Sequence, residues 1–381
     1  MIYLDNAATT WPKPSSVWSA MEHCFHKLGA NPGRSGHQMA LDAGRLIYET
    51  REVLAKLFNI SNPLQLVFTL NATEAVNLAL KGLLKPGDHI ITGSMEHNAV
   101  TRPLHVLKAR GVEVTKVKAA GDGRIKVEDV AAQIKANTKA VAFTHASNVT
   151  GTLMPIEELG QLARAKGLVF IVDAAQTAGV YDLDVEKMNI DLLAFPGHKS
   201  LYGPQGTGGL YIREGITLEP LKEGGTGSSS EHPLQPDVLP DRYESGTPNT
   251  IGIAGLGAAV KFILQEGLDK IRSHEEQLTK RFLQGVESIP GVVIYGPRDV
   301  TKQAPVVSIN FGQHDSSEVG FILDQVFKVA CRTGLHCAPD AHASLGTLGQ
   351  GTVRFSFSYF NTEEEIDAAL DSLRRISQEL K

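Results

Sequence analysis

Lys199 and Asp173 have the residue types and the spacing of a pair that could hold a cofactor. Lys199 stands between an apolar run and a glycine-rich segment, and Asp173 ends another apolar run 26 residues earlier. A carboxylate at the end of a buried strand is costly unless a cation or hydrogen-bond donors meet it. A lysine that bonds an aldehyde and an aspartate that pairs with a ring nitrogen are the two protein groups that pyridoxal phosphate requires. We therefore expect both side chains to converge on this cofactor.

Polar residues follow other apolar runs of the same region. Thr73 stands at the start of a helical pattern, where free backbone N–H groups would point at a phosphate. His97 could stack on a cofactor ring, and Asn148 and Gln176 could hydrogen-bond its phenolic oxygen. Each also has an ordinary interpretation: a capped helix, a loop histidine and two turn-forming residues.

Cys337 is the candidate nucleophile. Neighbouring glycine and proline residues indicate an exposed loop, and Arg332 and His336 could stabilise a thiolate there. The alternative, a small buried apolar side chain, fits Cys331 better because Cys331 ends an apolar run.

The chain that must position these residues alternates short β-branched runs with helical stretches. Repeated strand–helix–strand units predict an α/β fold with a mostly parallel sheet covered on both faces. The expected strands are residues 64–70, 89–93, 112–118, 139–147, 168–175, 190–196 and 208–212, and the expected helices are 73–84, 98–110, 126–136 and 156–166. Such sheets bind ligands beyond the carboxyl ends of their strands, which is where the candidate residues stand.

The second part of the chain predicts a smaller α+β domain. Residues 223–249 are rich in Gly, Ser and Pro and are expected to form a linker or a functional loop. A helical stretch at 251–289 leads to three strand patterns, at 291–297, 304–311 and 351–360, and to a final helix opened by a Thr362–Glu365 capping box. We expect a large domain at 15–250 and a small domain at 251–381, with residues 1–14 packing against the small one.

Composition excludes several classes of protein. The 381 residues are 42% hydrophobic and 21% charged, with a net charge of −5, no basic block and no run long enough to span a membrane. We expect neither a nucleic-acid partner nor a membrane anchor. The first ten residues lack a secretory pattern, and three cysteines are too few for a disulfide framework, so we expect a cytoplasmic protein. His23, Cys24 and His26 cluster in an expected helix without a second ligand group, and no metal site is expected there.

Eight motifs spread in order over the whole chain resemble those of the cysteine desulfurases. This family lies within the class V aminotransferase group of pyridoxal phosphate enzymes. The motifs are YLDNAATT, NATEAVNLA, EHNA, SNVTGT, VDAAQ, GHKSLYGPQGTGGLYI, ESGTPN and RTGLHCAP. The resemblance implies the fold-type I architecture of pyridoxal phosphate-dependent transferases and a homodimer in which each active site is completed by the neighbouring subunit. The segment around Cys337 resembles the group II desulfurases, which are related to the selenocysteine lyases.

The resemblance implies roles around the cofactor ring. Lys199 would bond the cofactor's aldehyde, Asp173 would pair with its pyridine nitrogen and Gln176 would contact its phenolic oxygen. His97 would stack on the ring and take part in proton transfer, with Asn148 beside it.

The resemblance also implies a phosphate cradle. The backbone at Ala72, the side chain of Thr73 and His198 would hold the phosphate, and Thr247 would reach the phosphate of the partner's site. Pro196 stands where many desulfurases have a serine or threonine, which removes one hydroxyl from this cradle.

Substrate would be held by arginines. Arg354 would bind the α-carboxylate through two parallel hydrogen bonds, with Arg332 and Asn148 nearby. An arginine in an otherwise apolar strand pattern supports this role, and a structural salt bridge is the alternative. Leu335 stands where the group II enzymes commonly have a second histidine.

The reaction implied is the conversion of L-cysteine to L-alanine, with sulfur passing to Cys337 as a persulfide and then to an acceptor protein or thiol. L-selenocysteine is an alternative substrate. A second hypothesis is another class V aminotransferase, epimerase or lyase in which Cys337 is idle. A third is a scaffold or regulatory protein that binds the cofactor without turnover.

Overall fold

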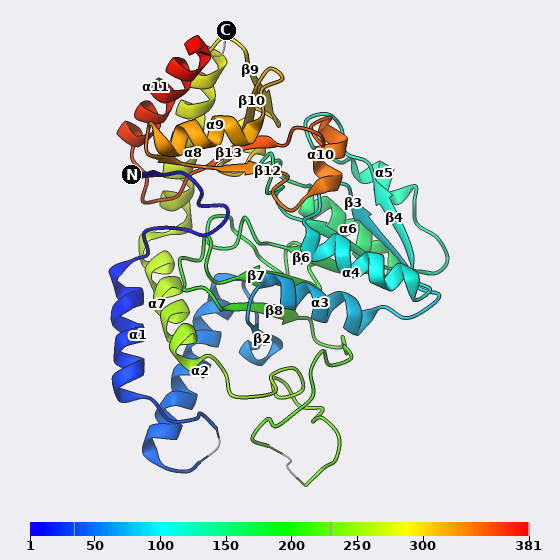
Figure 1. Ribbon diagram of the computed structural model, residues 1–381. Coiled ribbons are helices and arrows are strands. Elements are labelled where there is room, and N and C mark those ends of the chain that lie inside the picture. The colour runs from blue at the N-terminus through cyan, green and yellow to red at the C-terminus, as the bar shows by residue number, and fades with distance from the viewer. Residues whose placement is uncertain (34, 229–230, 380–381) are drawn as a thin grey trace.

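A seven-stranded sheet forms the centre of the molecule (Figure 1). The computed structural model describes residues 1–33, 35–228 and 231–379. The strand order is β2-β8-β7-β6-β5-β3-β4, and only β8 runs antiparallel to its neighbours. The strands are β2 (Leu66–Thr69), β3 (His89–Gly93), β4 (Glu113–Val117), β5 (Thr138–Thr144), β6 (Val169–Asp173), β7 (Leu192–Pro196) and β8 (Gly208–Ile212). The predicted mostly parallel α/β sheet is confirmed.

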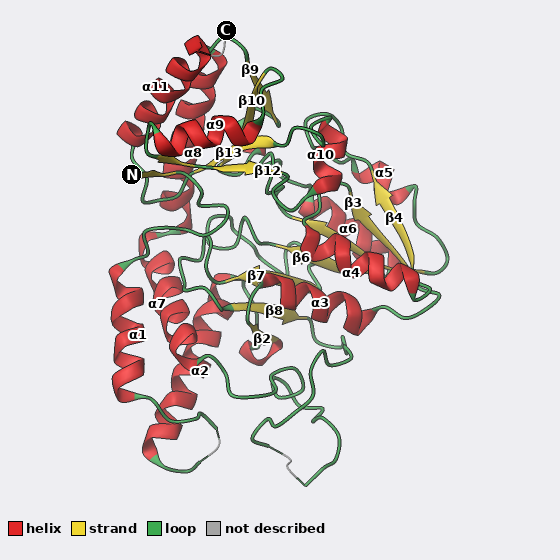
Figure 2. Cartoon of the chain, viewed as in Figure 1, coloured by secondary structure: helices red, strands yellow, loops and turns green. Residues whose placement is uncertain are grey.

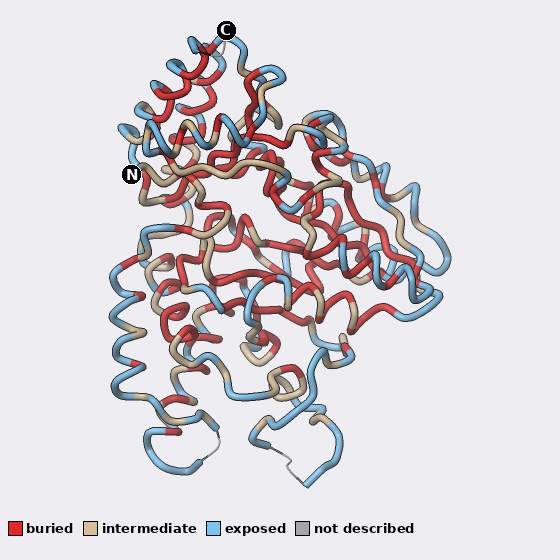
Figure 3. Tube along the Cα trace, in the orientation of Figure 1, coloured by how far each residue is buried: buried red, intermediate tan, exposed pale blue. Residues whose placement is uncertain are grey.

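Both faces of this sheet are buried. Successive side chains of a strand point to opposite faces, and in these strands the side chains on both faces are apolar. In β5, Val141 and Phe143 face one apolar cluster while Ala140 and Ala142 face another. Helices α3 (Ala72–Leu83) and α4 (Asn98–Ala109) cover the second face, and α2 (Gln38–Leu57), α6 (Ile156–Lys166) and α7 (Thr250–Glu266) supply side chains to the first. Figure 2 shows the strands enclosed by helices, and Figure 3 shows the strands as the most continuously buried part of the chain.

Two helical expectations differ from the structure. Helix α5 covers only Val127–Ala131, because the chain turns towards β5 and the Lys135 N–H donates to Thr138 Oγ1 (2.7 Å). The expected helix at 251–289 is two helices, α7 and α8 (Leu268–Glu287), bent by 84°. Gly267 between them has φ +89°, a conformation that ends α7 and that few other residues adopt.

The C-terminal part is built on a smaller antiparallel sheet of order β12-β13-β10-β9. Its strands are β9 (Val292–Tyr295), β10 (Val306–Phe311), β12 (Arg332–Gly334) and β13 (Thr352–Ser356), and its helices are α8, α9 (Ser316–Gln325), α10 (Pro339–Leu345) and α11 (Glu363–Glu379). The predicted capping box is present: Glu365 N–H donates to Thr362 Oγ1 and Thr362 N–H donates to the Glu365 carboxylate. The division of the chain at residue 250 stays a prediction.

The N-terminal segment connects the two sheets. Strand β1 (Ile2–Tyr3) pairs in parallel with β11 (Val329–Ala330), after which the chain crosses to the large sheet and enters α1 (Ser15–Lys27), as Figure 1 shows. Residues 4–13 therefore lie between the two parts of the molecule.

Within the described residues, no individual helix has the length and apolarity needed to cross a membrane. The bent pair α7 and α8 meets those two criteria only when both helices are taken together.

Replacing Gly160 by alanine is expected to destabilise the fold. A Cβ at Gly160 in α6 would lie 1.9 Å from the carbonyl oxygen of Met188, in the segment that leads to β7. We expect a loss of about 2 kcal/mol or more in the free energy of unfolding, measured by urea denaturation. The control is Gly44→Ala in α2, where the nearest atom is 3.9 Å away and helix propensity predicts a gain of up to about 1 kcal/mol. Equal stability changes in the two variants would contradict this explanation.

Candidate active site

A cavity of about 220 Å³ lies at the carboxyl ends of the central strands. It brings together nine of the predicted site residues: Ala72, Thr73, His97, Asn148, Asp173, Gln176, His198, Lys199 and Arg332. Eight of them stand at or just after the ends of five strands, β2, β3, β5, β6 and β7. The ninth, Arg332, comes from β12 of the small sheet. The edge of a parallel sheet is where such folds bind ligands. We call this space the inner cavity.

Lys199 lies just beyond the end of β7, in a turn closed by the Tyr202 N–H donating to the Lys199 carbonyl (2.8 Å). Burial lowers the pKa of its ammonium group to about 8; Asp173 opposes this shift, and Arg354 and Arg332 add to it. A lowered pKa increases the neutral fraction near pH 7, and the neutral amine is the nucleophilic form. Lys199 therefore meets the electrostatic requirement for bonding an aldehyde.

Asp173 is the last residue of β6 and is 4% exposed. Its Oδ1 accepts a hydrogen bond from the Ala175 N–H (3.0 Å). Burial raises the pKa of its carboxyl, while this hydrogen bond and Lys199 lower it. Gln176, one turn further, donates from Nε2 to the carbonyl of Ala7 (3.2 Å). A buried carboxylate aimed into a cavity is suited to a cationic ring nitrogen.

His97 caps the N-terminus of α4 and lines the inner cavity. Its Nδ1 accepts from the Ala99 N–H (3.0 Å), so the proton of the neutral ring is on Nε2. Burial, followed by the charge of Lys199, lowers the pKa of His97 to about 4. At neutral pH the ring is an uncharged donor at Nε2.

The start of α3 lines the inner cavity with Ala72 and Thr73. Asn71 caps this helix by accepting the Glu74 N–H at its side-chain oxygen (2.9 Å). First-turn N–H groups have no partner within a helix, and together with the helix dipole they favour an anion. Pro196, also in the lining, supplies no hydroxyl group here.

The N-terminal segment closes the inner cavity beside His198. Thr9 Oγ1 lies 3.1 Å from His198 Nδ1, and the His198 carbonyl accepts from Lys13 Nζ (2.6 Å) and from the Thr10 N–H (3.2 Å). Burial lowers the pKa of His198 and of Lys13, to about 4 and about 8 respectively. The sequence did not identify Lys13 and Thr9 as site residues. Their contacts are with His198, 185 and 189 positions further along the chain, and no local sequence pattern predicts such contacts.

Arg354, the arginine predicted in an apolar strand, is fully buried in β13 and lies behind the inner cavity rather than in its lining. Its Nη2 pairs with Asp5 Oδ1 (2.8 Å), and its Nη1 donates to the Asn148 carbonyl (2.9 Å). Its Nε has no partner among the described residues. Arg332 is the arginine that lines the inner cavity. Sequence reasoning did not identify Asp5 as the partner of Arg354.

Cys337 is exposed and lies at the edge of the inner cavity, where Arg332 Nη2 donates to its Sγ (3.4 Å). His336 and Cys337 have φ values of +48° and +58°, which is left-handed backbone that non-glycine residues rarely adopt. Two contacts hold this backbone: Asn148 Nδ2 donates to the His336 carbonyl, and the Asn98 N–H donates to the Cys337 carbonyl, both at 2.7 Å. Asn148 thus holds the cysteine loop with its amide nitrogen while its buried Oδ1 lacks a partner in the described chain.

The other two cysteines differ from Cys337. Cys24 is buried in α1, and Cys331 is partly buried, with the pKa of its thiol raised to about 12 by burial. His23 and His26 are exposed while Cys24 faces the interior, so the three side chains of this cluster diverge.

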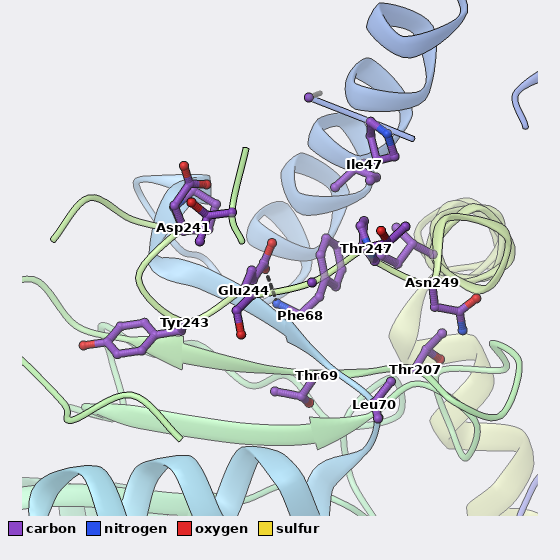
Figure 4. A pocket seen from close by; sticks show the side chains of 18 of the residues that line it. Ile47, Phe68, Thr69, Leu70, Thr207, Asp241, Tyr243, Glu244, Thr247 and Asn249 are labelled. Carbon is purple, nitrogen blue, oxygen red and sulfur yellow. Dashed lines mark hydrogen bonds between the residues drawn. The ribbon is translucent and has the colours of Figure 1, made fainter. Parts of the chain in front are cut away.

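Thr247 lies in a different cavity, of about 250 Å³, between α2, β2 and the 223–249 loop (Figure 4). The loop is fixed to the sheet by Glu244, which pairs through both oxygens with the buried Arg51 and accepts the Phe68 N–H. Within the described chain, Thr247 accepts a hydrogen bond from Asn31 Nδ2 (3.2 Å). Its predicted role at a partner's phosphate stays a prediction.

Comparison with known proteins gives full-length similarity. The aminotransferase class-V family model matches residues 2–369. A probable cysteine desulfurase of Methanothermobacter thermautotrophicus is 37% identical, over 99% of this chain and 94% of that protein. The apo structure of a cysteine desulfurase from Thermococcus onnurineus NA1 is 36% identical with a TM-score of 0.93, covering 99% of this chain and 95% of that one. The S-sulfonic acid form of the cysteine desulfurase CsdA from Escherichia coli is 29% identical with a TM-score of 0.88, covering 100% and 95%.

Asp5→Asn is expected to destabilise the protein by about 3 kcal/mol, because it leaves the fully buried Arg354 without its counter-charge. Thermal unfolding would measure the loss. Glu157→Gln is the matched control: it breaks an exposed ion pair with Lys187 and should cost at most about 1 kcal/mol. A loss for Asp5→Asn no larger than for the control would show that Arg354 is neutralised in another way.

Proposed function

This chain belongs to the class-V aminotransferase family, and from that premise we propose that it is a pyridoxal phosphate-dependent cysteine desulfurase. The observation that carries the proposal is one cavity in which Lys199 and Asp173 meet, with the exposed thiol of Cys337 hydrogen-bonded to Arg332 at its edge. The relatives described as cysteine desulfurases cover nearly the whole chain at 35–37% identity, which supports the same assignment.

The residues of the inner cavity fit this cofactor. Lys199, an amine with a pKa of about 8, would bond the aldehyde, and the buried carboxylate of Asp173 would pair with the ring nitrogen. The free N–H groups at the start of α3, with Thr73 and His198, suit a phosphate. The flat ring of His97 would lie against the cofactor ring, and Gln176 would donate to its phenolic oxygen.

When bound, pyridoxal phosphate supplies an electron sink for negative charge that develops at the substrate α-carbon. Lys199, with a pKa near working pH, can take the α-proton from that carbon and return a proton later. His97 can donate from Nε2 but does not hold a second proton near pH 7, because its pKa is about 4. Asp173 would pair with the ring nitrogen and keep its charge, since that contact would offset the cost of its burial.

The two arginines orient the substrate. Arg332 lines the inner cavity and can contact the α-carboxylate directly. Arg354 does not line the inner cavity and is held by Asp5 and the Asn148 carbonyl, so it would reach the same carboxylate only after its side chain shifted. A carboxylate between two guanidinium groups is a strong, directional arrangement.

Cys337 carries the sulfur. Its thiolate attacks the sulfur of the bound L-cysteine, an S–S bond forms, the substrate Cβ–S bond breaks, and the Cβ takes a proton. The balance is enzyme thiol plus L-cysteine giving enzyme persulfide plus L-alanine. Arg332 stabilises the thiolate through its contact with Sγ. An acceptor thiol or protein then removes the outer sulfur.

We also propose a homodimer in which Thr247 contributes to the partner's phosphate site, and a cytoplasmic location. The first is supported by the position of Thr247 in a cavity separate from that of Lys199. The second is supported by three free thiols, which suit a reducing compartment.

Purified protein supplied with pyridoxal phosphate and L-cysteine is expected to form alanine, quantified chromatographically, and sulfide when a reducing thiol is present. Lys199→Ala and Cys337→Ala should each lower the rate of alanine formation on the order of 100-fold or more. Cys331→Ala, the matched control, should retain the rate because burial keeps that thiol protonated. Full activity in Cys337→Ala would instead indicate another class V reaction, and no alanine with the wild type would reject the proposal.

Covalent cofactor binding is expected to follow the titration of Lys199. In the cofactor-free protein, the rate at which pyridoxal phosphate bonds Lys199 should rise with pH to a plateau with a midpoint near pH 8, well below that of an ordinary lysine. Asp173→Asn should move the midpoint to lower pH, because Asp173 raises the pKa of Lys199. Visible absorbance would follow the reaction. Lys199→Ala, which keeps the other low-pKa amine at Lys13, is the control and should show no such band.

A further inference from the structure

A second cavity, of about 370 Å³, opens beside the inner one and contains the thiol of Cys337. We call it the outer cavity. Its lining is Thr73, Asn77, Lys81, His97, Asn98, Ala99, Arg102, Pro103, Val106 and Cys337. Thr73, His97 and Ala99 line both cavities. Cys337 lines only the outer cavity and Arg332 only the inner one, so their contact bridges the two.

The walls of the outer cavity are the facing sides of α3 and α4, which pack against each other (Figure 1). Rigid walls on two helices give a fixed binding site rather than an adaptable loop surface. The volume falls at the lower end of the range for small-molecule sites. Val106 is the one exposed large apolar side chain in the lining, which is little apolar surface for docking a protein.

The charge of the outer cavity has one sign. Lys81 on α3 and Arg102 on α4 face it, and the described residues that line it include no carboxylate. Neither cation forms an ion pair in the part of the chain that the structure describes. Two acidic residues on adjoining elements are already paired, Glu74 of α3 with Lys222 and Asp340 of α10 with Lys116. Arg102 also acts on His97, which lines both cavities, because its positive charge contributes to the lowered pKa of His97.

We propose that the outer cavity binds the sulfur acceptor, and that this acceptor is a small thiol bearing one or more carboxylates. The inference rests on the proposed function. Lys81 and Arg102 bind the carboxylates, and the acceptor's thiolate attacks the outer sulfur of the Cys337 persulfide. A new S–S bond forms on the acceptor, the S–S bond to Cys337 breaks, and Cys337 leaves as thiolate. The acceptor departs as a persulfide, and no further oxidant or reductant is needed.

The arrangement separates the two halves of the reaction. L-Cysteine is held in the inner cavity by groups on the Arg332 side of the thiol, and the acceptor approaches from the Lys81 and Arg102 side. The acceptor therefore does not need to wait for the inner cavity to empty. Asn77, whose side chain donates to the Thr73 carbonyl (2.9 Å), adds a polar side chain to the lining of the outer cavity.

The test isolates the second half of the reaction. Wild-type holoenzyme is loaded with a single equivalent of L-cysteine and desalted at once, because excess L-cysteine is itself a small thiol with a carboxylate. Alanine and the persulfide, seen as one added sulfur by intact-protein mass spectrometry, are then quantified. Mercaptosuccinate, 2-mercaptoethanol or cysteamine is then added, and the rate of persulfide discharge is measured for each. Absence of alanine and persulfide in the loading step would overturn the proposed function itself.

For each thiol, the discharge rate of a variant is divided by that of wild type. This ratio removes the difference in intrinsic reactivity between the thiols. In Lys81→Gln/Arg102→Gln, discharge by mercaptosuccinate should fall about 10- to 100-fold, the range for losing charge-assisted hydrogen bonds, while the 2-mercaptoethanol rate changes less than about 2-fold. Lys108→Gln removes an exposed cation of α4 outside the outer cavity and should change neither. In wild type, added salt should slow the discharge of the persulfide by mercaptosuccinate but not its discharge by 2-mercaptoethanol.

Two results would overturn the inference while leaving the proposed function intact. One is the same salt dependence of persulfide discharge for the anionic and neutral thiols in wild type, or the same fold loss with both in the double variant. The other is a persulfide that small thiols do not discharge but a protein thiol does. The salt dependence is measured on wild type, so the test stands even if the double variant is unstable.

Discussion

The site depends on removing one amine, that of Lys199, from water without giving it a close counter-charge. Burial is the largest contribution to its lowered pKa, and Asp173 only partly reverses it. A direct salt bridge would have kept the ammonium form, which bonds no aldehyde. The sheet buries the amine and keeps the carboxylate out of a direct salt bridge with it. Asp173 stands at the end of β6 and Lys199 beyond the end of β7, in one cavity but on adjacent strands. Parallel pairing is what brings the two strand ends to the same edge.

The N-terminal segment maintains this desolvation. It pairs with β11 through β1, bridges to β13 of the small sheet at Asp5 and Ser356, neutralises Arg354 with Asp5, and closes over His198 with Thr9 and Lys13. A single segment therefore fixes the position of the small sheet relative to the lysine and shields the lysine's neighbour from solvent. Disturbing its contacts is expected to affect cofactor binding and stability together, because both depend on the same hydrogen bonds.

Most of the sheet and its ligand-binding edge could be predicted from the sequence, because runs such as residues 168–172 are apolar on both faces and are followed by a polar residue, here Asp173. The break at Gly267 was missed because the apolar pattern continues on both sides of it, and only the backbone angle distinguishes a bend from a helix interior. The pairing of Arg354 with Asp5 joins residues 349 positions apart, and no local pattern encodes such a partner. The order of the motifs predicted which residues belong to the site. Their division between the inner and the outer cavity could not be predicted, because it depends on how α3 and α4 pack.

The backbone of the cysteine loop explains why the thiol stands between those cavities. Two successive left-handed residues, His336 and Cys337, are unfavourable unless the surroundings hold them, and a cost on the order of 1–3 kcal/mol each is typical. Asn148 and the N-terminus of α4 hold them through the two carbonyls. Both restraints come from the large sheet's ligand-binding edge, although the loop belongs to the small sheet's chain. The Cys337 sulfur is therefore positioned by the same residues that surround the inner cavity, and its place is set by the fold rather than by motion of a long loop.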